Sequence, residues 1–352
     1  MKSNGIAKIQ QLDQFEDIID VRSPSEYAED HIPGAINCPV LSDEERIQIG
    51  TMYKQASPFE AKKLGAAYIA KRIAQHIETL FIGKPKEWKP LIYCWRGGKR
   101  SGSMTYILRQ IGWNAHILDG GYKSYRRDVV SQLSEKGGQF KYQVITGMTG
   151  SAKSKILERL SELGAQVLDL ENLAQHKGSV LGNLPQAPQP SQKMFETQLL
   201  LELQKLSRDK IVFVEAESRK IGCLHVPDAL LNNMRQSPCI RIEATMPARV
   251  DFLIRDYPYF IDQPENLIET IGFLKEMHGK DRLDHWKNLV SEKNWQQLVQ
   301  ELLEEHYDAL YKRSQNSNYV NYDKAVCYSS ADLSVKGIDI LAQQIWMDHQ
   351  HA

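Results

Sequence analysis

The segment with the most chemical content is a cysteine loop that follows an apolar run. Leu91-Ile-Tyr predicts a strand that ends at Cys94, and glycines follow within the loop. A thiol in water has a pKa of about 8.5, and amide and guanidinium groups directed at the sulfur lower it. We therefore expect Cys94 to be a catalytic nucleophile. The residues expected to bind an anionic group beside it are Arg96, Gly97, Gly98, Lys99 and Arg100.

A second anion-binding loop is predicted in the other half of the chain. Tyr142–Thr146 predicts a strand, and Gly147-Met-Thr-Gly-Ser-Ala-Lys-Ser154 leads into a helical run. This is the context of a P-loop, in which amides and a helix N-terminus surround phosphate oxygens. One departure is Ala152, which stands where such loops usually have glycine. The residues expected to hold a diphosphate are Gly147, Thr149, Gly150, Ser151, Lys153 and Ser154.

Two acidic residues follow the next buried strand. The run Lys210-Ile-Val-Phe-Val ends at Glu215, and Glu217 comes two residues later. A P-loop protein places its metal-directed carboxylate at this point, so both are candidates for a Mg²⁺ ligand or an acid. We expect no metal site beyond this one and no tightly bound cofactor.

The order of the predicted elements places these loops in an α/β fold. Short apolar runs alternate with helical patterns, which favours mainly parallel sheets with helices on both faces and active loops at strand C-termini. The first half has strands at 18–21, 91–93 and 115–118, and helices at 43–79, broken near Ser57-Pro58, and 101–110. A polar connection around Ser134-Glu-Lys-Gly-Gly predicts two domains, 1–135 and 136–352. Amphipathic patterns over 265–312 predict a helical C-terminal region in the second domain.

Composition narrows the class of protein. The 352 residues carry 44 basic and 44 acidic side chains, so any surface for RNA must be a local patch. Five cysteines without paired spacing favour a reducing compartment. No signal peptide and no stretch of roughly 18 apolar residues is present, which predicts a cytoplasmic protein that does not act in a membrane.

The first domain resembles a rhodanese domain. The resemblance rests on Asp20-Val-Arg22, Glu26-Tyr27, His31-Ile-Pro-Gly-Ala-Ile-Asn37, Cys94 and Leu118-Asp-Gly-Gly-Tyr122. It implies that Cys94 holds sulfur or selenium, and that Asp20 and Arg22 help to hold the fold. Five residues separate Cys94 from Arg100. That loop is similar to the longer Cys-x5-Arg loop of rhodanese-related phosphatases, and its width favours an oxyanion such as selenophosphate.

Over about residues 15 to 315 the chain resembles the bacterial tRNA 2-selenouridine synthases. Both loops contribute to the resemblance, together with Pro188-Gln-Pro-Ser-Gln-Lys193 and Glu217-Ser-Arg-Lys-Ile-Gly222. Ala152 and Ala216 depart from the family pattern, at the phosphate end of the chemistry. The fold implied is a rhodanese-like domain followed by a P-loop NTPase-like α/β domain.

The resemblance also implies a two-step exchange on tRNA that carries 2-thiouridine at the wobble position. Geranyl diphosphate would first alkylate the sulfur, with its diphosphate in the P-loop, and selenophosphate would then replace the geranylated sulfur with selenium. Cys94 would either carry selenium covalently, which we expect, or position the donor. Selenophosphate synthetase is the implied supplier of selenium. The oligomeric state is left open.

Candidate contacts to tRNA combine cations with an aromatic ring. Basic side chains suit phosphate contacts, and an aromatic ring can stack on an unstacked base. A solvated helix face is an equal alternative for the pair Arg126-Arg127. The candidates are Lys123, Tyr125, Arg126, Arg127, Arg219 and Lys220.

Two other functions remain open from the sequence. The Cys-x5-Arg loop alone would allow a phosphatase, which would need a general acid and would leave the fused P-loop unexplained. A non-catalytic regulatory protein, in which the rhodanese domain senses metabolites and the P-loop binds nucleotide, is the third hypothesis.

Overall fold

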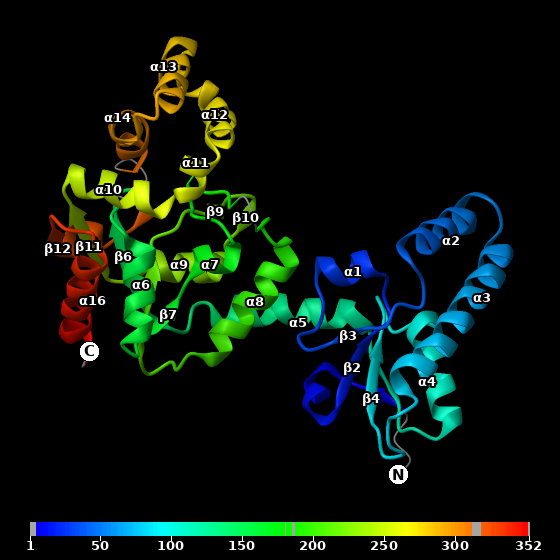
Figure 1. Ribbon diagram of the computed structural model, residues 1–352. Helices are drawn as coiled ribbons and strands as arrows, with labels where there is room; N and C mark the ends of the chain where they lie inside the picture. The colour runs from blue at the N-terminus through cyan, green and yellow to red at the C-terminus, as the bar shows by residue number, and fades with distance from the viewer. Residues whose placement is uncertain (1–4, 180, 185–186, 312–317, 351–352) are drawn as a thin grey trace. The chain divides into compact units, whose positions relative to one another are not determined.

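The chain forms two compact units, shown in the computed structural model in Figure 1. The structure describes residues 5–179, 181–184, 187–311 and 318–350. The units are Met1–Ser131 and Gln132–Ala352. The predicted boundary after residue 135 falls within helix α5 (Gly121–Lys136).

The first unit is built on a parallel sheet. Its strand order is β1-β5-β4-β2-β3, and every neighbouring pair is parallel. The strands are β1 (Ile6–Ala7), β2 (Asp17–Asp20), β3 (Ile36–Asn37), β4 (Pro90–Tyr93) and β5 (His116–Leu118). The helical elements before α5 are η1 (Ile9–Gln14), α1 (Pro24–Glu29), α2 (Asp43–Gln55), α3 (Pro58–His76), the π-helical turn η2 (Ile77–Phe81) and α4 (Lys99–Ile111).

Local sequence signals explain several of these boundaries. Ser23 caps α1 in a capping box with Glu26, and Pro24 is its first residue. The long helical pattern from Asp43 breaks at Ser57-Pro58, as predicted, because Ser57 caps the new helix α3 and Pro58 begins it. Between the helices and the sheet lies a core of apolar residues that includes Ile92, Met104 and Trp88.

The second unit contains another parallel sheet. Its order is β12-β11-β6-β8-β7, with parallel pairing throughout. The strands are β6 (Lys141–Gly147), β7 (Gln166–Leu168), β8 (Ile211–Glu215), β11 (Cys239–Ala244) and β12 (Val326–Ser330), and β9 (Lys220–Ile221) and β10 (Leu224–His225) form a separate antiparallel pair. The helical elements up to β11 are α6 (Lys153–Glu162), α7 (Leu170–Ala174), α8 (Gln192–Lys205) and α9 (Asp228–Gln236).

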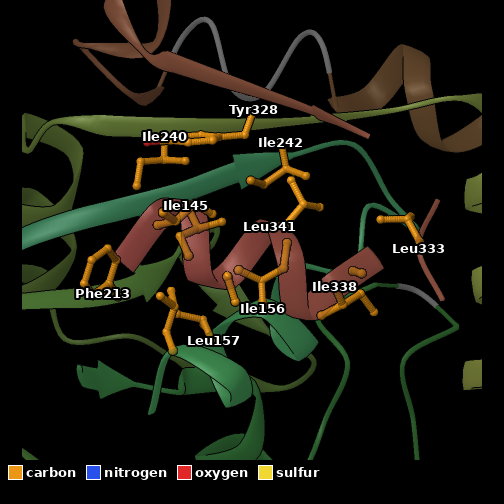
Figure 2. Packing of buried hydrophobic residues seen from close by; sticks show 14 of the residues in the cluster. Ile145, Ile156, Leu157, Phe213, Ile240, Ile242, Tyr328, Leu333, Ile338 and Leu341 are labelled. Atoms are coloured by element: carbon orange, nitrogen blue, oxygen red, sulfur yellow. The ribbon is translucent and has the colours of Figure 1, made fainter. Parts of the chain in front are cut away.

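A single apolar core covers one face of this second sheet. Figure 2 shows Ile145, Ile240 and Ile242 of the sheet packed toward Ile156 and Leu341. Most of this layer comes from α6 and α16 (Val335–His349), which also contact each other. The opposite face is buried as well, since Val144, Val212 and Val214 have no exposed surface. Helices therefore shield both faces of the sheet, as a parallel sheet requires.

The C-terminal region contains the predicted helices and, after them, a strand and a helix that were not predicted. Amphipathic helices are present, and they enclose a core that includes Leu267, Trp286 and Leu298. They are α10 (Met246–Asp256), α11 (Pro258–Asp262), α12 (Pro264–Gly272), η3 (Phe273–Glu276), α13 (Lys280–Ser291), α14 (Trp295–Leu302) and η4 (Leu303–Tyr307). The last residue of the predicted range, 312, lies outside the described residues. After the short turn η5 (Tyr322–Lys324), β12 forms an edge strand of the sheet and α16 packs against the sheet. Neither element was predicted from the sequence.

Among the described residues, each helix is too short or too polar to span a lipid bilayer.

Candidate functional site

The cysteine loop lies between β4 and α4 in the first unit. Cys94 follows the buried strand, and α4 begins five residues later at Lys99. Gly97 has φ +65°, and a side chain there would come within 2.8 Å of the Leu118 carbonyl oxygen. The Tyr122 amide donates to the Cys94 carbonyl at 2.8 Å. The predicted glycine is thus needed for the loop to lie against the segment that follows β5.

Hydrogen-bond donors converge on the Cys94 sulfur. The Gly98 amide donates to Sγ at 3.3 Å, and the Ser101 hydroxyl donates at 3.2 Å. The thiol is buried, which by itself raises its pKa, but the bonds from Ser101 and the Arg96 amide and the charge of Arg100 outweigh burial and lower the pKa. The site therefore favours a thiolate. Ser101, which is fully buried, had no role in the sequence analysis.

The cations of this loop are not equivalent. Arg96 and Lys99 are exposed to solvent. Arg100 is half-buried, and its guanidinium donates to both oxygens of Glu26 at 2.6 and 3.2 Å. Because Glu26 also caps α1, it fixes Arg100 in place near the sulfur. In the sequence, Glu26 contributes only to the rhodanese resemblance, and its bond to Arg100 was not predicted.

We expect the Cys94 thiolate to depend on Ser101. Alkylation of Cys94 by iodoacetamide, followed across pH by peptide mass spectrometry, should show a midpoint below the roughly 8.5 of a free thiol. Replacing Ser101→Ala removes a charge-stabilising bond, so the midpoint should rise by about one pH unit. Exposed Cys223 in the same samples is the internal control and should not shift. An unchanged Cys94 midpoint in the variant would mean that the loop amides and Arg100 lower the pKa without Ser101.

The P-loop lies between β6 and α6 in the second unit. Gly147 ends the strand, and Ala152 precedes the helix with φ +62°, a left-handed conformation that glycine adopts at lower cost. The Ala152 methyl is nevertheless buried in the core beneath the loop. The loop therefore keeps its fold with alanine in place of the usual glycine.

Side chains of the P-loop face a cavity of about 1080 Å³. Thr149, Gly150, Lys153 and Ser154 line it, whereas Gly147 and Ser151 are not among its lining residues and Ser151 is buried. Lys153 Nζ donates to the Gly147 carbonyl at 3.0 Å and lies 3.3 Å from Glu215 Oε1. The Gly147 amide donates to the Tyr311 hydroxyl at 2.5 Å.

Three carboxylates gather at the same end of the sheet. Oxygens of Glu171, Glu215 and Glu217 lie within 4.8 Å of one another, and Ser154 Oγ lies within hydrogen-bond distance of Glu171, at 2.9 Å, and of Glu215, at 3.0 Å. Burial, and next the charge of Glu215, raises the pKa of Glu171 to about 8. Burial and the charges of the other two raise the pKa of Glu217 well above its usual range.

A divalent cation fits this group of oxygens. Mg²⁺ prefers carboxylate and hydroxyl oxygen ligands, and its charge would relieve the repulsion that raises these pKa values. Glu171 had no role in the sequence analysis. It follows β7, which pairs in parallel with β8, so the two strands end at the same edge of the sheet. That parallel pairing is the signal that could have identified it.

An apolar cavity of about 80 Å³ adjoins the larger one. The two share Thr149, Ser179, Leu253, Tyr257 and Tyr307 in their walls. The rest of its wall is almost entirely apolar and comes mainly from α10, α11, α12, α14 and η4, with side chains such as Leu267, Trp295 and Leu298. The site thus joins an anion-binding loop to an apolar pocket.

Most, but not all, of the residues predicted to contact RNA are exposed. Lys123, Arg127, Arg219 and Lys220 are exposed, and Arg126 is partly buried. Arg219 forms an exposed ion pair with Asp228 at 2.7 Å. Tyr125 is buried, with its ring 6.2 Å from that of Tyr122, so the expected stacking of a base on Tyr125 is not supported.

Comparisons with known proteins match both units. Residues 6–128 match the family model of a rhodanese-like domain, and residues 140–278 match the model described as the tRNA 2-selenouridine synthase AAA domain. The predicted fold, a rhodanese-like domain followed by a P-loop-like domain, is confirmed.

Several curated relatives are called tRNA 2-selenouridine synthase. One from Nitrosomonas europaea is 37% identical over 68% of this chain and 63% of its own length. One from Bdellovibrio bacteriovorus is 36% identical over 68% of this chain and 64% of its own length. A relative from Sulfurovum sp. is 31% identical over 88% of this chain and 84% of its own length. The matched part of the chain therefore spans less than two thirds of the first two relatives.

Proposed function

Because the chain belongs to the tRNA 2-selenouridine synthase family, we propose that it is a transferase that replaces sulfur with selenium in tRNA. The substrate is 2-thiouridine at the wobble position. The reaction has two stages, alkylation of the sulfur by geranyl diphosphate and replacement of the geranylated sulfur by selenium from selenophosphate. The protein acts in the cytoplasm, where selenophosphate synthetase supplies the selenium donor.

The observation that carries this proposal is the pair of adjoining cavities in the second unit. A prenyl diphosphate has a charged head and an apolar tail, and the site offers Lys153 and the loop amides beside an apolar pocket. The head would lie in the larger cavity at the P-loop. The tail would begin there and end in the smaller cavity against residues such as Leu298.

Alkylation is a substitution at C1 of the geranyl group. The thiocarbonyl sulfur forms a bond to C1, the C1–O bond breaks, and pyrophosphate leaves with the electron pair while the base loses its N3 proton. Lys153 and the loop amides stabilise the charge that develops on the departing oxygen. A Mg²⁺ ion held by Glu171, Glu215 and Glu217 would add charge stabilisation to the diphosphate.

The apolar cavity gives a direct test of the geranyl assignment. Val299 lines the cavity and is only partly buried, so Val299→Phe should fill it without disturbing the core. Displacing part of the tail should raise the KM for geranyl diphosphate by about tenfold or more, at about 0.8 kcal/mol for each CH₂ group returned to water. Steady-state kinetics on 2-thiouridine tRNA measures the effect.

Inorganic pyrophosphate is the matched control ligand for this variant. Its Kd, measured by calorimetry, should stay within twofold of the wild-type value because it has no tail. If KM for geranyl diphosphate is also unchanged, the tail does not enter this cavity.

A further inference from the structure

The Cys94 thiolate could attack selenophosphate at selenium or at phosphorus. The two reactions differ in whether they need an electron acceptor. Attack of the Cys94 thiolate on selenium would join sulfur to selenium in a perselenide. Selenophosphate carries selenium at the oxidation level of selenide, so a perselenide forms only if two electrons are accepted, either by phosphorus, which would leave as phosphite, or by an added oxidant. Attack on phosphorus is neutral in electrons and needs no co-reactant. The covalent selenium carrier expected from the sequence therefore needs an acceptor for two electrons, and attack on phosphorus needs none.

The surroundings of Cys94 suit attack on phosphorus. The sulfur accepts bonds from the Gly98 amide and the Ser101 hydroxyl, which favour the thiolate and fix its position. The loop curls around it and leads into α4, whose N-terminus favours anions. Arg100, held by Glu26, and exposed Arg96 add positive charge on the same loop. A phosphoryl group on Sγ would thus be surrounded by donors and cations.

The carboxylates beside the loop indicate which leaving group the site can release. Glu26 is bound to Arg100, and Asp20, in register with Tyr93, is bound to Arg22 at 2.6 Å. Both carboxylates are occupied by these ion pairs, so neither is placed to give a proton to a leaving group. An alkoxide that leaves a phosphate ester needs such a proton. Hydroselenide is a much weaker base and departs without one.

We infer that Cys94 attacks the phosphorus of selenophosphate and releases hydroselenide, a step that rests on the proposed function. The S–P bond forms, the P–Se bond breaks, and selenium leaves as HSe⁻ with the electron pair. Hydroselenide then adds to C2 of the S-geranylated base, and geranyl thiolate leaves. Water attacks the phosphorus of the phosphocysteine, the S–P bond breaks, and phosphate departs as the Cys94 thiolate is restored.

The first test uses the full-length protein and selenophosphate in a single turnover without tRNA. The reaction is quenched in denaturant, and the Cys94 peptide is analysed by mass spectrometry. A phosphoryl group and a selenium atom add nearly the same mass, but the isotope pattern of selenium tells them apart. We expect an adduct without that pattern. In Cys94→Ala, phosphate release should fall by at least about 100-fold, whereas Cys223→Ala, which removes an exposed thiol in the other unit, should behave as the wild type.

The second test supplies hydroselenide in place of selenophosphate. Cys94→Ala should then convert S-geranylated tRNA into selenouridine tRNA at a rate close to that of the wild type, although it fails with selenophosphate. A selenium isotope pattern on Cys94, release of phosphate by Cys94→Ala at the wild-type rate, or failure of hydroselenide to rescue the variant would each overturn the inference. If the wild type forms phosphocysteine but makes no selenouridine from either donor, the proposed function fails and the Cys94 step stands.

Discussion

Replacing Lys153→Ala should leave 2-thiouridine tRNA unmodified. Lys153 Nζ donates a hydrogen bond to the Gly147 carbonyl of the P-loop and forms an ion pair with Glu215. In the proposed reaction it stabilises the charge that develops on pyrophosphate. Removing one such donor typically lowers the rate about 10²–10³-fold. Mass spectrometry of nucleosides after incubation with geranyl diphosphate measures the loss of the S-geranylated product.

Two controls make this result specific. Lys210→Ala removes an exposed lysine of the same unit that lines neither cavity, and it should keep wild-type activity. S-geranylated tRNA supplied directly, together with selenophosphate, should still be converted to selenouridine by Lys153→Ala, since that stage belongs to Cys94. If Lys153→Ala geranylates tRNA at more than a tenth of the wild-type rate, the P-loop does not take part in the alkylation step.

The buried ion pair of the first unit should dominate its stability. Asp20 and Arg22 have no exposed surface, and Arg22 donates to both oxygens of Asp20 and to the Asp30 carbonyl. Its guanidinium also lies 4.0 Å from the centre of the Tyr122 ring. Asp20→Ala would leave that charge buried without its counter-ion. We expect the free energy of unfolding of this unit to fall by about 3–5 kcal/mol.

Unfolding of this unit can be followed separately from the other. Cys38 is fully buried in its core, so urea-dependent labelling of Cys38, read by mass spectrometry, reports on the first unit alone. Asp13→Ala, at an exposed position, is the control and should change stability by less than about 0.5 kcal/mol. A loss below about 1 kcal/mol in Asp20→Ala would show that Arg22 finds another counter-charge.

Much of the fold could be predicted because local signals agree with the final structure. The apolar run before Cys94 and the run before Gly147 are buried strands, and each reaches its loop where the pattern ends. Membership of the tRNA 2-selenouridine synthase family, predicted from motifs in both domains, is confirmed. Ser57-Pro58 separates two helices because capping and proline geometry are properties of the local sequence.

The parts that were not predicted depend on contacts between distant segments. Ser101 and Glu26 matter to Cys94 through bonds that no spacing rule encodes, since Glu26 lies on α1 and reaches Arg100 on α4. Glu171 joins Glu215 only because β7 and β8 pair in parallel. β12 carries little apolar pattern and is exposed at several positions, so its place at the sheet edge is set by pairing with β11. Burial of Tyr125 likewise could not be read from its basic neighbours.

The packing of α16 on α6 has a consequence for how the protein is made. The core beneath the P-loop joins Leu160 of α6 to Ile345 of α16, which are far apart in the chain. A ribosome adds roughly 5–20 residues each second, so α6 waits on the order of ten seconds or more before its partner exists. During that time the apolar side of α6 has no α16 to cover it. We expect the first unit to be folded while the second still depends on chaperones.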